Sequence, residues 1–163
     1  MKRTYAADTT VSVARSMSEI TDLLRAWGCQ EVRWSENWST REVQLRFVWV
    51  HEGAQLTARF AVRVAADEVL LKDLPDKHRY NQEGRASWLN REREQRARSS
   101  MRVVLIKLKA DFSMVEAGIC SAAEVLLPFM ENTRGHTIAE LVVPKLLEVA
   151  RGDDGALQLE GPT

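Results

Sequence analysis

One uninterrupted stretch limits the possible folds of this chain more than any other feature: residues 86–117 contain neither proline nor glycine. Both residues break helices, so their absence over this length predicts one helix of ~30 residues, or ~45 Å at 1.5 Å rise per residue. Apolar residues recur at helical spacing only in its second half. They are Met101, Leu105, Leu108, Phe112 and Val115. We therefore expect the second half to pack on a core and the first half to project, either into solvent or against another copy of the chain.

Three runs before this helix have the pattern of β-strands. They span residues 32–34, 43–50 and 56–64, and turn-forming residues separate them. The apolar positions of the second run alternate and share one face, namely Val43, Leu45, Phe47 and Trp49. The third run repeats the alternation and places Arg59 and Arg63 on its more polar face. Period-two alternation of this kind predicts an antiparallel sheet with one covered face and one wet face.

The N-terminal segment predicts a short strand followed by a helix. The residues from Thr9 to Val13 are partly β-branched and alternate, which suits a strand. Ser16 and Glu19 then have the spacing of a capping box, and Gly28 is placed as a C-terminal stop. The apolar residues of this helix are Ile20, Leu23, Leu24 and Trp27. We expect the helix to cover the dry face of the sheet.

The remaining segments predict a connection and then a mainly helical C-terminal half. Residues 65–84 mix charges with turn formers and show no clear period, so they are expected to be irregular. Gly118 should end the long helix. Capping-box spacing begins at Ser121 and again at Thr137, and Pro144 should kink the last helix.

Length and composition fit one water-soluble domain. The chain has 163 residues, of which 45% are apolar and 28% charged. The predicted fold class is α+β: a short strand and helix, a three-stranded antiparallel sheet, a long helix and a helical C-terminal half. The domain spans residues 1–151, and residues 152–163 form a flexible acidic tail. Neither a membrane span of ~20 apolar residues nor a signal peptide is indicated, so we expect a cytoplasmic protein.

No common catalytic or cofactor motif occurs in the sequence. A nucleophile elbow, a phosphate loop, a dinucleotide-binding glycine pattern and the HExxH and EF-hand spacings are all missing. Cys29 and Cys120 lie far apart without a CxxC pair, and they are expected to be reduced and partly buried. The histidines, His51, His78 and His136, fall in predicted turns without metal-ligand spacing. The sequence therefore predicts no catalytic residue, no metal and no cofactor, and favours a protein that is not an enzyme.

A cluster of arginines in the first half of the long helix is the main functional candidate. The formal net charge of the chain is zero, so attraction to nucleic acid has to be local. Between residues 85 and 109 there are eight basic side chains against two acids, an excess of six. The basic residues are Arg85, Arg91, Arg93, Arg96, Arg98, Arg102, Lys107 and Lys109, and the acids are Glu92 and Glu94. The arginines of this set are the predicted phosphate contacts, and Trp38 is a candidate for base stacking.

Two other interpretations of the same residues stay open. In one, the arginines belong to a solvated helix end and pair with the chain's own acids, because they spread over more than half of the helix circumference. In the other, the long helix contacts protein in an oligomeric adaptor or inhibitor. A further alternative involves other residues: the chain binds a small phosphorylated ligand through Arg59, Arg63 and the long helix.

Three stretches carry a resemblance to a family of small uncharacterised proteins encoded by bacteriophages and prophages. They are TTVSVARSMSEITDLLRAWGC, MRVVLIKLKADFSMVEAGI and FMENTRGHTIAELVVPKLLE, and together they cover under half of the chain. Their residues serve capping, packing and turns, so the resemblance implies a shared fold and no catalytic residues. It also implies a bacterial cytoplasm. We expect a non-enzymatic phage accessory protein that binds DNA, RNA or a nucleic-acid-processing complex, with a second copy or a host or phage protein as alternative partners.

Overall fold

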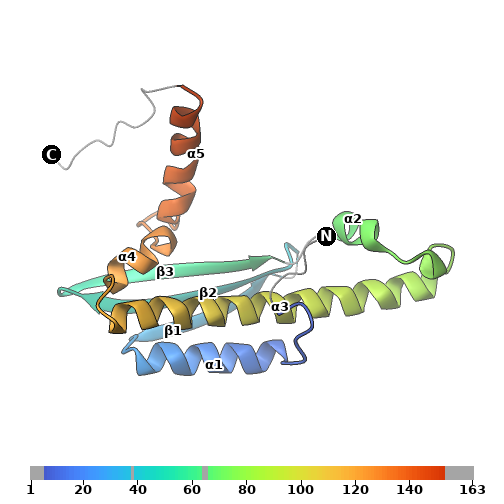
Figure 1. The fold of residues 1–163 in the computed structure, drawn as a ribbon, viewed down its shortest axis with the longest axis horizontal. Coiled ribbons are helices and arrows are strands. Elements are labelled where there is room, and N and C mark those ends of the chain that lie inside the picture. Colours follow the sequence, from blue (N-terminus) through green and yellow to red (C-terminus); the bar gives the residue numbers. More distant parts are fainter. Residues whose placement is uncertain (1–5, 38, 64–65, 153–163) are drawn as a thin grey trace.

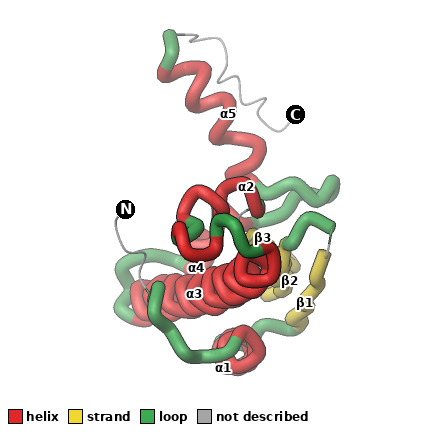
Figure 2. The backbone as a smooth tube through the Cα atoms, turned by 90° about the vertical axis from the view of Figure 1, so that its right-hand side faces the viewer, coloured by secondary structure: helices red, strands yellow, loops and turns green. Residues whose placement is uncertain are grey.

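The structure is a computed structural model that describes residues 6–37, 39–63 and 66–152. It is an α+β fold in which helices cover one face of a three-stranded antiparallel sheet (Figures 1 and 2). The strands follow the order β1-β2-β3, and their bounds are Glu31–Asn37, Glu42–His51 and Ala54–Arg63. The two longest helices are α1 (Val13–Ala26) and α3 (Gln82–Glu116). The predicted fold class and the three predicted strands are confirmed. The first two strands extend beyond their sequence patterns at both ends, and β3 begins two residues earlier than its pattern, whose last residue, 64, lies outside the described residues.

The hydrophobic core lies between the sheet and these two helices. Leu45, Phe47 and Trp49 of β2 are buried, as the alternation predicts. They pack in one cluster with Ala58 and Phe60 of β3, Ile20 and Leu24 of α1, and Leu105, Leu108 and Phe112 of α3. The prediction that α1 covers the dry face is thus confirmed, and the second half of α3 covers it as well.

The hairpin between β2 and β3 follows from its turn residues. Glu52 and Gly53 have φ values of 51° and 80°, and they connect the paired residues His51 and Ala54. Two central residues with positive φ match the twist of a two-residue hairpin, and glycine adopts this backbone without strain. The turn fixes the register that places the apolar faces of β2 and β3 on the same side.

The predicted strand at residues 9–13 is wrong. These residues form no strand, and α1 begins at Val13 because Ser12 caps it, accepting a hydrogen bond from the Arg15 amide at 3.2 Å. Ser16 consequently lies inside the helix and is buried, so it is not the cap that the sequence predicts. The preceding segment is held by Gln95, whose side-chain amide donates to the carbonyl oxygens of Ala7 and Thr9. A strand there would need its carbonyl groups for a neighbouring strand.

The predicted connection contains short helical pieces. They are α2 (Asp67–Leu70) and the 3-10 turns η1 (Leu71–Asp73) and η2 (Asp76–His78). Leu70 is fully buried, and α2 contacts α3, so this segment is anchored to the long helix. Each piece is one turn long, which is too short to show a helical period in the sequence.

The long helix has 35 residues and begins at Gln82, four residues before the predicted start. Asn81 caps it by accepting a hydrogen bond from the amide of Gly84. A side chain at Gly84 would require the His78 ring of η2 to move, because a Cβ atom would lie 2.8 Å from its Nδ1. The helix ends at Glu116, and Gly118 follows it with φ of 69°, as the sequence predicts.

The C-terminal half is helical, and both predicted capping boxes are present. Ser121 caps α4 (Ala122–Leu126), which leads into the 3-10 turn η3 (Leu127–Phe129). Thr137 caps α5 (Ile138–Ala150), and the helix continues through Pro144. Figures 1 and 2 show α5 pointing away from the rest of the molecule. The predicted tail lies almost entirely outside the described residues, and no helix within them is long and apolar enough to span a bilayer.

Candidate nucleic-acid interface

The first half of α3 and the segment that leads into it form an extension, which we call the arm and define as residues 66–98. Figure 1 shows this part of α3 reaching well beyond the strands, with α2 and the two 3-10 turns beside it. Only two large apolar side chains of the arm are buried, Leu70 and Leu89. Polar contacts therefore contribute much of the support for the arm.

Two of the predicted arginines are engaged by acids that precede the helix. Arg93 donates to Asp67 through Nε, at 3.0 Å, and through a second guanidinium nitrogen. Arg96 pairs with Glu92 at 2.8 Å and with Asp73 at 3.3 Å. Because Asp67 and Asp73 lie 26 and 23 residues before their partners, no local sequence pattern connects them.

Two further predicted arginines are engaged in the same way. Arg98 pairs with Glu94, which lies four residues earlier on the same helix. Arg102 pairs with Glu19 of α1 at 2.7 Å, and this contact lowers the pKa of Glu19. Four of the six predicted arginines therefore have their charge offset within the molecule.

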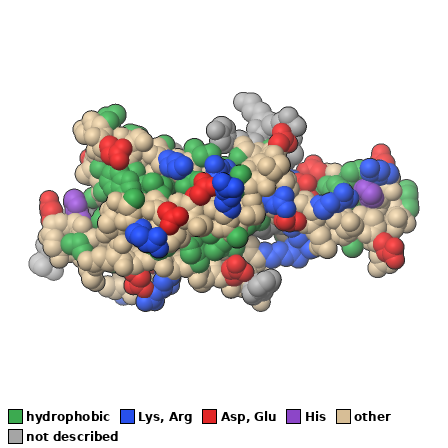
Figure 3. All heavy atoms as spheres, turned by 90° about the horizontal axis from the view of Figure 1, so that it is seen from below, with side chains coloured by type: hydrophobic (Ala, Val, Ile, Leu, Met, Phe, Trp, Pro, Cys, Tyr) green, Lys and Arg blue, Asp and Glu red, His purple; other side chains and the backbone are tan. Residues whose placement is uncertain are grey.

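The charge of the arm is close to balanced once the acids of its first segment are included. Residues 66–98 hold eight basic side chains and seven acidic ones. Figure 3 shows acidic and basic side chains interspersed on one face of the molecule, without a continuous basic band. The excess of six counted along α3 alone does not describe the folded surface.

Two of the predicted arginines keep their charge exposed. Arg85 and Arg91 are exposed and form no ion pair with any other residue that the structure describes. Lys77 of η2 is exposed and likewise has no carboxylate partner in this part of the chain. The sequence prediction missed Lys77 because it lies in the segment assigned as an irregular connection.

A hollow of about 560 Å³ lies between η2 and α3. Its lining includes Lys77, His78, Trp88, Arg91, Glu92 and Arg98. Glu92 is paired with Arg96, and Glu94, which also lines the hollow, is paired with Arg98, so Lys77 and Arg91 are the lining charges left without an ion pair among the described residues. Trp88 is half-buried at the same hollow. The hollow thus combines positive charge with an aromatic surface.

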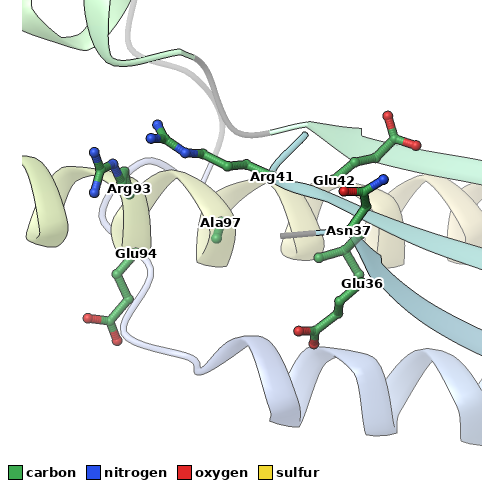
Figure 4. Close-up of a pocket in the computed structure, with 8 residues that line it drawn as sticks. Glu36, Asn37, Arg41, Glu42, Arg93, Glu94 and Ala97 are labelled. Carbon is green, nitrogen blue, oxygen red and sulfur yellow. The ribbon is translucent and has the colours of Figure 1, made fainter. Parts of the chain in front are cut away.

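A second hollow, of about 290 Å³, lies between the end of the sheet and α3 (Figure 4). At one side of it the Arg41 and Arg93 side chains lie near one another. Both guanidinium groups bind Asp67, and these hydrogen bonds, first from Arg41 and then from Arg93, lower its pKa to about 2. Because Asp67 already binds the Arg41 and Arg93 guanidinium groups, they are not free to bind an anionic ligand. We therefore assign these two arginines a structural role.

The tryptophans in and beside the sheet differ from Trp88 in their surroundings. Trp49 is buried in the core, and Trp34 donates a hydrogen bond from Nε1 to the Thr21 hydroxyl at 3.1 Å. Trp38, the predicted stacking residue, lies outside the described residues. Of the tryptophans that the structure describes, Trp88 alone lines the hollow with uncompensated basic groups.

Arg59 and Arg63 lie on the face of the sheet opposite α3, because they alternate with the buried residues of β3. Arg59 is only 10% exposed and pairs with Glu131 at 2.9 Å and Glu140 at 2.6 Å. Arg63 pairs with Glu42. The structure therefore does not bring these arginines together with the long helix.

Comparisons with known proteins add no identification. No family model, curated protein or solved structure matches the chain. Within the described residues, no group of histidine, cysteine and carboxylate side chains is arranged to hold a metal ion. Both cysteines are half-buried free thiols, and burial raises the pKa of Cys29 to about 11. The hollow between η2 and α3 is thus the best candidate for a binding site among the described residues.

Proposed function

We propose that this chain is a non-enzymatic accessory protein that binds an unpaired strand of nucleic acid at the hollow between η2 and α3. The observation that carries the proposal is the pair of uncompensated basic side chains, Lys77 and Arg91, which line the same hollow as Trp88. Lysine and arginine are the main phosphate contacts of proteins, and an indole face stacks any unpaired base. A hollow of this size is within the range of ligand sites.

The helix geometry extends the contact by one residue. Arg85, Trp88 and Arg91 are spaced three residues apart, so their side chains are neighbours along one side of α3. Arg85 therefore adds a third positive charge beside the hollow. The proposed interface consists of Lys77, Arg85 and Arg91 around Trp88, and it is smaller than the stripe that the sequence predicts. The paired arginines are assigned to holding the arm together.

The setting of this activity rests on the resemblance to phage and prophage proteins. We place the protein in a bacterial cytoplasm and in the accessory functions of a phage, with a nucleic acid or a complex that processes it as the partner. The alternative that Arg59 and Arg63 bind a small phosphorylated ligand has less support, because Arg59 already forms ion pairs with two carboxylates.

A charge reversal at the hollow tests the proposal against simple net-charge attraction. Arg91→Glu should weaken binding to a single-stranded oligonucleotide by at least about tenfold, since it replaces a phosphate contact with repulsion. Lys109→Glu is the matched control, because Lys109 is exposed on the same helix, beyond the arm, and makes no ion pair with any described residue. Fluorescence anisotropy at low salt measures both affinities. Equal losses in the two variants would contradict a site at the hollow.

Trp88 distinguishes strand binding from binding of phosphate alone. Trp88→Ala should weaken binding of the oligonucleotide by roughly 1–3 kcal/mol and leave the weak binding of inorganic polyphosphate unchanged. Quenching of tryptophan fluorescence on addition of the oligonucleotide should be lost in the same variant. If Trp88→Ala binds the oligonucleotide as well as the unmodified chain does, base stacking at the hollow is excluded.

A protein partner is the second candidate function, and the surface of α5 favours it. No residue of α5 is buried, although the helix is rich in valine and leucine. That surface is separate from the arm, so the two functions are compatible.

A further inference from the structure

The last helix exposes apolar side chains that no other part of the described chain covers. Val143, Leu146 and Leu147 are 49%, 47% and 51% exposed. They lie on a helix of 13 residues that contains a proline and has no buried residue. Isolated helices of this length are marginal in water, because the cost of nucleation is not recovered without tertiary packing. Packing of the exposed side of α5 against a partner would therefore stabilise the helix.

Five apolar residues of α5, four of them exposed and Ala139 half-buried, form a narrow band, which we call the α5 stripe. It consists of Ala139, Val143, Leu146, Leu147 and Ala150. At 100° per residue these positions fall within about 100° of the circumference of the helix, which is the width of surface that one packed helix covers. Pro144 lies outside the band, so the missing amide does not interrupt it. Leu141, also exposed, points to the opposite side of the helix.

The charges beside the stripe are arranged for self-recognition. Glu140 near the start of α5 and Arg151 at its end lie on the same flank of the stripe. Two copies of α5 packed antiparallel bring Glu140 of each copy near Arg151 of the other. In a parallel two-fold pair the same flanks of the two copies lie on opposite sides of the interface, so this attraction between Glu140 and Arg151 is lost. Glu140 already binds Arg59 and is still 46% exposed, so its carboxylate can accept a second cation.

The direction of α5 favours the same arrangement. The helix joins the body at its N-terminal end and points away from it (Figures 1 and 2). In an antiparallel pair the two bodies lie at opposite ends of the helix pair, which is ~20 Å long. In a parallel pair both bodies would meet at one end and compete for the same space.

We propose that the α5 stripe is the interface of a homodimer, in which α5 of one copy packs antiparallel on α5 of a second copy. The dimer is two-fold symmetric, so each copy presents the same surface. One short helix pair makes a small interface, and the dimer therefore dissociates on dilution. Dimerisation at α5 leaves the arm of each copy free.

Sedimentation equilibrium over a wide range of concentrations tests the dimer. The unmodified chain should change from dimer to monomer on dilution. Leu147→Glu places a charge in the stripe of both copies and should raise the dissociation constant by at least about a hundredfold. Leu141→Glu is the matched control, with the same change on the opposite side of α5, and should leave the constant unchanged. A chain that stays monomeric at every concentration, or equal effects of the two variants, would overturn the proposal.

Cysteine cross-linking tests the antiparallel direction. In a chain with Cys29→Ser and Cys120→Ser, Ala139→Cys and Ala150→Cys introduce one thiol at either end of the stripe. A mixture of the two variants should form a disulfide-linked dimer on mild oxidation, and each variant alone should form little. Efficient self-linking of each variant alone would show a parallel pair and overturn this arrangement. Circular dichroism of each variant verifies that the fold is retained.

Discussion

At the scale of single residues, the arm depends on where its carboxylates lie. Asp67 receives hydrogen bonds from Arg41 and Arg93, which lie 26 residues before it and 26 residues after it in the sequence. An ion pair with two forked guanidinium groups has a fixed geometry, whereas an exposed single pair contributes little. The side chain of Asp67 is only 28% exposed and binds two guanidinium groups, so we expect it to contribute more than an exposed single ion pair does.

Asp67 makes the stability of the fold depend on pH. Its pKa is lowered from 3.8 to about 2, so the folded state is favoured at pH values above about 4 and loses this advantage as the pH falls toward 2. Asp67→Asn should lower the free energy of unfolding near neutral pH, and the difference from the unmodified chain should shrink between pH ~4 and ~2. Urea unfolding at a series of pH values measures it.

A carboxylate in an exposed pair provides the comparison. Asp22 pairs with Arg25 on α1 and is 66% exposed, so Asp22→Asn should change the free energy of unfolding by no more than about 0.5 kcal/mol. A loss for Asp67→Asn that stays constant over the whole pH range would show that the charge of Asp67 is not the cause.

At the scale of elements, α3 has two halves with different support. Leu105, Leu108 and Phe112 in the second half are buried against the sheet and α1, whereas the arm half buries Leu89 alone among its large apolar side chains. The second half is therefore part of the core. The first half is held by ion pairs and by η2, which approaches closely at Gly84.

The core half of α3 should be sensitive to loss of side-chain volume. Leu108 is fully buried, so Leu108→Ala should lower the free energy of unfolding by about 2–5 kcal/mol through the cavity that it leaves. Met114, on the same helix, is 41% exposed, and Met114→Ala should cost less than about 1 kcal/mol. Chemical denaturation compares them. Similar losses in both variants would show that the second half of α3 is not packed as described.

Elements with a local signal could be predicted from the sequence. The capping boxes at Ser121 and Thr137, the stop at Gly118 and the alternation in β2 and β3 each depend on neighbouring residues, and all are present. The sequence pattern places the start of α1 incorrectly because Ser12 and Ser16 are both suitable caps. In the structure Ser12 is the cap, and Ser16 is buried inside the helix.

The candidate site was predictable only in part, since its charge depends on distant contacts. The cluster of arginines is visible in the sequence, but Asp67, Asp73 and Glu19, which offset three of them, lie more than twenty residues away along the chain. Lys77 and Trp88 meet at the hollow only because η2 folds back on α3. Neither of these facts follows from a local pattern.

At the scale of the whole molecule, net charge and local charge have separate roles. The formal net charge is zero, and most arginines of the arm are offset internally. What remains for a partner is a small positive area around Trp88 at one end and an apolar stripe at the other. We therefore propose a dimer that holds two binding arms apart.

The salt dependence of binding to a single-stranded oligonucleotide tests the central claim most directly. Each phosphate contact contributes about −0.7 to the slope of log affinity against log salt concentration, so contacts from Lys77, Arg85 and Arg91 predict a slope of about −2. A slope near −4 would mean that all six arginines predicted from the sequence bind phosphate, which contradicts their internal pairing. No binding at low salt would contradict the proposed function itself.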